Sequence, residues 1–179
     1  YDMSTNIFER LPQIFFEEKP DNRDYVRFLG REKNKRVYKY VLRSYINRVG
    51  ILDKYKVLIP KGNGSGKFGE IISIPVLADP GTGSTETFLS IGGFETKDEA
   101  SNVLSYIKTK FCRALLGVLK ITQDITPAVW HFVPLQDFTT ASDIDWTKPI
   151  PEIDRQLYAK YVLYENEISF IEKNVKEMK

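Results

Sequence analysis

The chain has 179 residues, of which 42% are hydrophobic and 28% charged, and its formal net charge is +2. This length and composition are typical of one globular domain with a core of its own, with or without a small appendage. No apolar run approaches the ~18 residues of a membrane span, and a lone cysteine, Cys112, excludes an internal disulfide. The single cysteine and the lack of an apolar span lead us to expect a cytoplasmic protein without membrane contact. Because the chain begins at Tyr1, we also expect it to be a piece of a longer protein.

Apolar periodicity and turn residues predict the secondary structure in chain order. The first half is predicted to contain a short helix that Pro12 ends, strands at 25–32 and 36–46 around the polar turn Lys33–Lys35, and strands at 56–60, 70–77 and 88–91. A turn at Gly92-Gly93 follows, and then a long helix that Thr96 caps and that reaches Gln123. The chain is predicted to end with a strand at 129–133 and helices at 151–161 and 165–178.

Two of these elements are informative about packing. The second strand alternates, so Lys39 and Arg43 are predicted to share a face. The long helix carries a single apolar stripe, which is typical of a scaffold helix that packs on a sheet rather than of a DNA-reading helix. The stripe consists of Ala100, Val103, Leu104, Ile107, Phe111, Leu115 and Val118.

Positive charge is concentrated in one segment of the chain. Residues 31–67 contain 11 Lys and Arg side chains but only the acids Glu32 and Asp53, a local charge of +9. Tyrosines and aliphatic residues are interleaved with these cations, so the segment does not have the composition of a disordered basic tail. We interpret it as a folded surface that contacts nucleic-acid phosphates, although cations that merely protect a strand edge would give a weaker form of the same pattern.

Catalytic motifs are weak or absent. The glycine loop 62–67 resembles a phosphate-binding loop but has three residues between its glycines and no Ser or Thr after Lys67. Asp79, Glu95 and Lys97 have the residue types of a metal-dependent nuclease, without the spacing that would identify one. The only histidine, His131, is predicted to be a hydrogen-bonded sheet residue. We therefore assign no catalytic residue and no metal ligand.

Ordered sequence runs carry a family resemblance. They are LDKYKVLI at 52–59, DPGT at 79–82, TETFL at 85–89, YIKTKF at 106–111 after the helix start at 99–100, ITQ at 121–123, FVPLQDF at 132–138, LYAKY at 157–161 and ENEISFIE at 165–172. Together they resemble the C-terminal region of adenine-specific DNA methyltransferases of bacterial type II restriction-modification systems, including those that combine restriction endonuclease and modification in one chain. The resemblance covers about residues 36–178, and the family's ending Lys-Tyr-Gly-Leu is here Lys160-Tyr161-Val162-Leu163.

The resemblance implies a target-recognition domain, which is not an enzyme on its own. It selects the double-stranded DNA sequence for a linked methyltransferase domain upstream, and that upstream domain is expected to bind S-adenosylmethionine. No cofactor is expected in this piece, which lacks the family's glycine-rich cofactor loop and Asn-Pro-Pro-aromatic motif.

The expected fold is α+β: a mixed, mostly antiparallel sheet packed on one long helix at residues 1–149, with a small helical C-terminal extension at 150–179. A metal-dependent restriction nuclease and a non-catalytic assembly module remain alternative functions. Asn34 and Gln123 are further candidates for reading bases. The expected DNA-binding residues are Arg31, Lys33, Lys35, Arg36, Lys39 and Arg43 for phosphates, and Lys61, Asn63, Ser65, Lys67, Thr82 and Ser84 in two loops.

Overall fold

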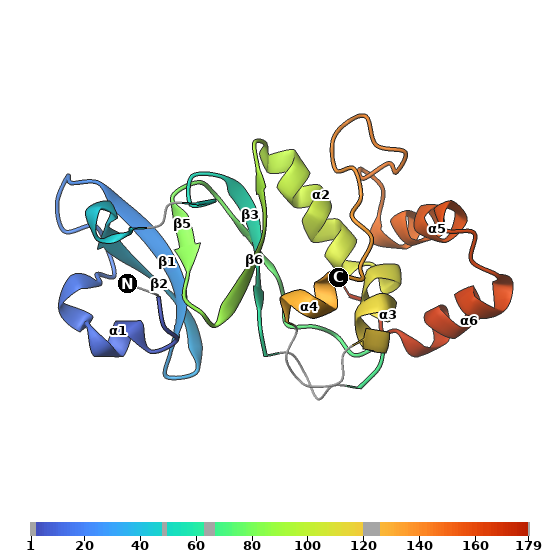
Figure 1. Cartoon of the computed structure of the whole chain (residues 1–179), viewed down its shortest axis with the longest axis horizontal. Coiled ribbons are helices and arrows are strands. Elements are labelled where there is room, and N and C mark those ends of the chain that lie inside the picture. The colour runs from blue at the N-terminus through green and yellow to red at the C-terminus, as the bar shows by residue number, and fades with distance from the viewer. Residues whose placement is uncertain (1–2, 48–49, 63–66, 120–125, 179) are drawn as a thin grey trace. The chain divides into compact units, whose positions relative to one another are not determined.

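A computed structural model describes residues 3–47, 50–62, 67–119 and 126–178 (Figure 1). It confirms the α+β class, with short strands in small sheets and several helices. The chain forms two compact units: unit 1 comprises residues 1–60 and 76–97, and unit 2 comprises residues 61–75 and 98–179. The residues on both sides of the predicted domain boundary at 149/150 belong to unit 2. The boundary itself stays a prediction.

Unit 1 contains the strands and unit 2 most of the helices. The elements of unit 1 are α1 Ile7–Arg10, the 3-10 turns Pro12–Ile14 and Arg43–Tyr45, β1 Tyr25–Glu32, β2 Lys35–Leu42, β3 Tyr55–Pro60, β4 Val76–Ala78, β5 Thr82–Ser84 and β6 Phe88–Phe94. Those of unit 2 are α2 Lys97–Lys108, whose first residue belongs to unit 1, α3 Lys110–Leu119, α4 Pro127–Trp130, α5 Ile150–Lys160 and α6 Glu165–Asn174.

The first sheet has the strand order β2-β1-β5. Figure 1 shows its long β1–β2 hairpin with α1 beside it. The hairpin is antiparallel in register from Tyr25↔Leu42 to Glu32↔Lys35, and β5 runs parallel to β1. The predicted pair of strands is confirmed, but β2 ends at Leu42 instead of Ile46, because residues 43–45 turn into a 3-10 helix. The prediction that residues 80–84 form a DNA-contacting loop is also wrong in part, because Thr82–Ser84 forms the strand β5.

The first sheet is buried on both faces within unit 1. One face packs Phe28 and Val41 with Phe8 and Phe15 of the N-terminal segment. The other face packs Leu29 of β1 with hydrophobic residues of the second sheet, namely Leu58, Ala78 and Phe88. Burying an apolar side chain typically stabilises the fold by about 1.5–3 kcal/mol, so these two layers anchor the middle of the hairpin.

The second sheet, in the order β4-β3-β6, corrects two strand predictions. Only Val76–Ala78 of the predicted strand 70–77 pairs with β3. The predicted turn at Gly92-Gly93 lies inside β6, with φ values of 92° and 154°, and the register slips between Tyr55 and Val57 at this point. Glycine permits a bulge here, where a side chain would be strained.

The predicted long helix is two helices in the structure. The Thr109 hydroxyl donates to the Tyr106 carbonyl at 2.6 Å and accepts from the Cys112 amide at 3.1 Å. The Asp154 carboxylate of α5 then accepts hydrogen bonds from the Lys110 and Phe111 amides at 3.0 and 2.8 Å. A side chain that bonds the backbone locally competes with the helix ladder, so the chain breaks and α3 begins anew with a capped N-terminus.

The apolar stripe lies on two helices rather than one. Ala100, Val103, Ile107 and Phe111 are buried as predicted, whereas Val118 is 72% exposed. In unit 2, α3 packs on α5 and α6, and the rings of Phe111 and Tyr161 stack at 4.9 Å. The predicted packing of a sheet on this helix stays a prediction.

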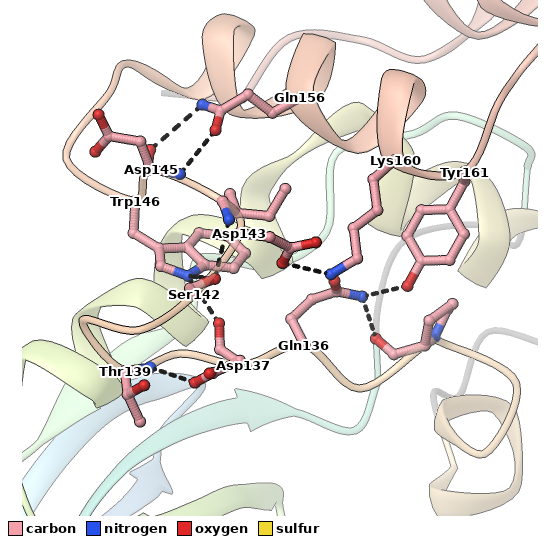
Figure 2. Close-up of polar contacts among 12 residues, drawn as sticks. Gln136, Asp137, Thr139, Ser142, Asp143, Asp145, Trp146, Gln156, Lys160 and Tyr161 are labelled. Atoms are coloured by element: carbon pink, nitrogen blue, oxygen red, sulfur yellow. Dashed lines mark hydrogen bonds and ion pairs between the residues drawn. The ribbon is translucent and has the colours of Figure 1, made fainter.

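Residues 136–147 form a strap that hydrogen bonds hold against α5 (Figure 2). The Trp146 indole donates to the Asp137 carbonyl at 2.9 Å, and Lys160 pairs with Asp143 at 2.7 Å. Gln136 donates to the Tyr161 hydroxyl at 2.7 Å. The helix predictions at 151–161 and 165–178 are confirmed for α5 and α6, although α6 ends at Asn174.

The predicted strand 129–133 is wrong. Its first residues belong to the short helix α4, and the exposed His131 follows that helix, in ring contact with Phe132. Pro127 at the first helical position favours this helix, because its fixed φ suits a helix start. His131 therefore does not lie in a sheet as the sequence predicts.

Candidate nucleic-acid interface

Four of the residues predicted to contact phosphates lie at the turn end of the β1–β2 hairpin. Lys33 and Asn34 form the two-residue turn, with φ values of 47° and 63°, which correspond to the type I′ geometry that suits twisted hairpins. We call the exposed cations around this turn the ribbon tip; they are Arg31, Lys33, Lys35 and Arg36.

Electrostatic repulsion is built into the ribbon tip. Arg31 lies directly opposite Arg36 in the strand register, and like charges in this position destabilise a hairpin. Partial burial of the otherwise exposed Arg36 side chain lowers the pKa of its guanidinium, and the facing charge of Arg31 lowers it further. The Arg36 guanidinium also lies 5.8 Å from the ring of Phe88. An anion bound between the two arginines would relieve their repulsion.

The only acid within residues 31–36 is already paired. Glu32 accepts a hydrogen bond from the Lys39 ammonium at 2.8 Å. The ribbon tip therefore presents a local excess of positive charge at the end of a rigid ribbon, which is the arrangement that attracts phosphate groups.

Lys39 lies in a different environment from the one predicted. It is only 8% exposed, pairs with Glu32 and with Glu17 at 3.4 Å, and lies 5.6 Å from the Phe8 ring. Burial disfavours its ammonium form, but the two carboxylates outweigh this effect and raise the pKa of Lys39. Its side chain points to the Phe28 and Val41 face of the sheet, which packs on the N-terminal segment.

Arg43 is also engaged within the fold. Its guanidinium forms a two-pronged pair with the Asp53 carboxylate, both contacts at 2.9 Å, and a third contact with Asp24 at 2.9 Å. The hydrogen bond to Asp53 raises the pKa of Arg43. Because β2 ends before Arg43, this residue does not share a strand face with Lys39, and neither side chain belongs to the ribbon tip.

A substitution of Lys39 separates its structural role from DNA contact. Lys39→Met keeps the long apolar stem but leaves the Glu32 carboxylate without its cation, so we expect unit 1 to lose about 1–3 kcal/mol of stability. The salt dependence of DNA binding should stay as in the wild type. Hydrogen exchange of the β1 amides measures the loss of stability, and binding titrations at several salt concentrations measure the salt dependence. A salt dependence flatter than that of the wild type would instead identify Lys39 as a phosphate contact.

The remaining predicted contacts are dispersed. Thr82 is 2% exposed, and its hydroxyl accepts from Arg27 at 3.4 Å, while Ser84 is half-buried on the same strand. Lys61 and Lys67 belong to unit 2, whereas the ribbon tip belongs to unit 1. Asn63, Ser65 and Gln123 lie outside the described residues.

Arg27 is a basic residue that the sequence analysis missed. It lies on the same face of β1 as Arg31, and its guanidinium covers the ring of Tyr38 at 4.5 Å. The signal was present in the sequence, because residues four apart in a strand point to the same side. The buried Leu29 lies between Arg27 and Arg31 on this face and packs on the second sheet, so Arg27 is separate from the ribbon tip.

The geometry does not favour the nuclease alternative. Asp79, Glu95 and Lys97 are exposed, and Glu95 pairs with Lys54. Over the described ranges, no group of three or more His, Cys, Asp or Glu side chains is placed to hold a metal ion. The lone thiol of Cys112 is buried in unit 2.

Comparisons with known proteins found no match to this chain among protein-family models, curated proteins or solved structures. Within the described part of the chain, every helix is too short or too polar to cross a lipid bilayer.

Proposed function

We propose that this chain recognises double-stranded DNA through the ribbon tip, on behalf of a linked adenine-specific methyltransferase. The observation that carries the proposal is the placement of Arg31, Lys33, Lys35 and Arg36 around one two-residue turn. The major groove of B-DNA, about 12 Å wide, admits a two-stranded β-ribbon. A ribbon with cations on both strands reaches the phosphates that border the groove.

The ribbon tip and the linked domain have different roles in this proposal. The ribbon tip neutralises phosphates and sets the position of the protein, as phosphate contacts generally do. The resemblance to methyltransferase C-terminal regions supports a linked upstream domain that binds S-adenosylmethionine and receives the flipped adenine. In this proposal the chain acts on cytoplasmic DNA and performs no chemistry itself.

Salt-dependent binding tests the proposal. The 179-residue chain, titrated with a duplex of random sequence, is expected to bind with log affinity that falls linearly with log salt, at a slope of about −3.6 for four phosphate contacts. Fluorescence anisotropy of labelled DNA at several salt concentrations measures this slope. Arg10→Gln, which removes an exposed cation of α1, serves as the control and should leave the slope unchanged. Absence of binding at low salt would overturn the proposed function.

A further inference from the structure

The apex of the hairpin carries two side chains in an unusual backbone conformation. Among the described residues, Lys33, Asn34 and Val162 are the non-glycine residues with positive φ. Left-handed backbone costs an ordinary side chain about 1–2 kcal/mol, and Asn-Gly or Gly-Gly would form this turn with less strain. Asparagine is among the side chains that tolerate this conformation, so the turn suits Asn34 without requiring it, whereas it does not favour Lys33.

The backbone of the apex is fixed from within the ribbon. The Arg31 guanidinium donates to the Asn34 carbonyl at 3.2 Å, and Asn34 is exposed. Ribbon-tip cations flank it on both sides, at Lys33 and Lys35. A ribbon whose cations meet phosphates on either side of a groove brings the residue at its apex toward the base edges between them.

The chemistry of Asn34 selects among base edges. A carboxamide has one acceptor and two donor hydrogens, which match N6 and N7 of adenine as a bidentate pair in the major groove. In the minor groove A·T and T·A present only acceptors, so a carboxamide there does not distinguish them. The dimensions of a two-stranded ribbon also match the wider groove.

We propose that Asn34 determines specificity by reading an adenine in the major groove, while Lys33 and the other ribbon-tip cations hold the phosphates. This inference rests on the proposed function, since it assigns the base read at the same site. It names an adenine of the recognition sequence and does not concern the adenine that the linked domain methylates.

The first experiment identifies the base. The 179-residue chain selects duplexes from a randomised pool, and the selected duplex is then resynthesised with 7-deazaadenine at one adenine at a time. This analogue replaces N7 with a C–H group in the major groove and leaves the minor groove unchanged. We expect one position at which affinity falls by at least roughly 5-fold, the lower end for loss of a bidentate pair. Inosine in place of guanine, which changes the minor groove, serves as the control and should have no effect at the neighbouring positions.

The second experiment assigns that base to Asn34. Asn34→Gly keeps the positive φ of the turn and removes the carboxamide, so it is expected to bind the selected duplex roughly 5- to 150-fold more weakly and to be indifferent to 7-deazaadenine. Its salt slope should equal that of the wild type. Asn34→Asp also suits the turn, and its acceptor-only carboxylate should shift the selected base from adenine toward cytosine, whose N4 donates.

The outcomes separate this inference from the proposed function. Two results would overturn the reading of adenine by Asn34 while phosphate contact by the ribbon tip stands. In the first, the wild-type chain binds random duplex but is insensitive to 7-deazaadenine at every position. In the second, Asn34→Gly selects the same base as the wild type and has the same sensitivity to 7-deazaadenine. If the chain binds no duplex at low salt, the proposed function itself fails.

Discussion

Replacing all four ribbon-tip cations with glutamine is expected to lower the affinity for random duplex DNA by roughly 1,000- to 10,000-fold at about 0.1 M salt. Each phosphate contact contributes about 0.9 to the salt slope, so each is worth close to tenfold at this salt concentration. The salt slope of the variant should accordingly approach zero. The substitutions are Arg31→Gln, Lys33→Gln, Lys35→Gln and Arg36→Gln.

A matched charge control decides whether position or net charge is responsible. The control variant carries Gln at four exposed cations that do not belong to the hairpin, namely Arg10, Lys148, Arg155 and Lys173. It loses the same four charges and should bind DNA within a few-fold of the wild type. An equal loss of affinity in both variants would show that binding depends on overall charge, not on the ribbon tip. Thermal unfolding followed by circular dichroism checks that both variants fold.

The ribbon-tip variant is not expected to unfold. Its four side chains are exposed, and replacing Arg31 and Arg36 removes a repulsive cross-strand pair. The middle of the hairpin is anchored by Leu29 and Phe28 on opposite faces of the sheet. A small gain in stability accompanied by a large loss of affinity would be characteristic of residues retained for binding.

The second large effect concerns Asp154, the cap of α3. Asp154 is 2% exposed and accepts both the Lys110 and Phe111 amides, and it lies close to the buried Arg113. Asp154→Leu would leave these two amides without acceptors, each at a cost of about 1–3 kcal/mol, so unit 2 should lose about 2–6 kcal/mol of stability. Both tryptophans, Trp130 and Trp146, belong to unit 2, so their fluorescence in a urea titration reports on this unit.

Asp154 also predicts how stability depends on pH. Burial raises the pKa of Asp154 to about 6 from the ordinary value of 3.8. A raised acid pKa stabilises the folded state fully below the unfolded pKa, and this contribution is lost as pH rises through about 6. The neutral Asp154→Asn lacks this titration, so it should be most costly near pH 4 and on the order of 1–3 kcal/mol less costly near pH 7.

An exposed aspartate provides the control of opposite sign. Hydrogen bonds from Thr147 lower the pKa of Asp145, so its contribution is present above the ordinary pKa and lost as pH falls. Asp145→Asn should therefore be more costly at neutral pH than in acid. A cost of Asp154→Asn that rises with pH, as for Asp145, would contradict the assignment of a raised pKa to Asp154.

Part of the fold could be predicted from local pattern. The β1–β2 hairpin follows from two runs of β-forming residues around Lys33 and Asn34, and the turn tolerates only a few residue types. β3 and α5 were likewise recovered almost to the residue. The basic character of the ribbon tip was also visible, because charge excess is a property of composition.

Other features depended on partners that are distant in the sequence. Lys39 and Arg43 look like ordinary surface cations, and only the fold brings Glu17, Asp24 and Asp53 to them. The break at Thr109 depends on Asp154, which is 44 residues away from Lys110. Residues 70–75 have the composition of a strand but belong to none of the strands of the structure.

The sequence alone was sufficient for the α+β class, the hairpin and its concentration of positive charge, because local periodicity and composition determine these properties. Only the tertiary structure decided that Lys39 and Arg43 are used by carboxylates of the same chain. The physical reason is that an ion pair requires two groups within about 4 Å, and residues far apart in sequence reach that distance only after the chain has folded.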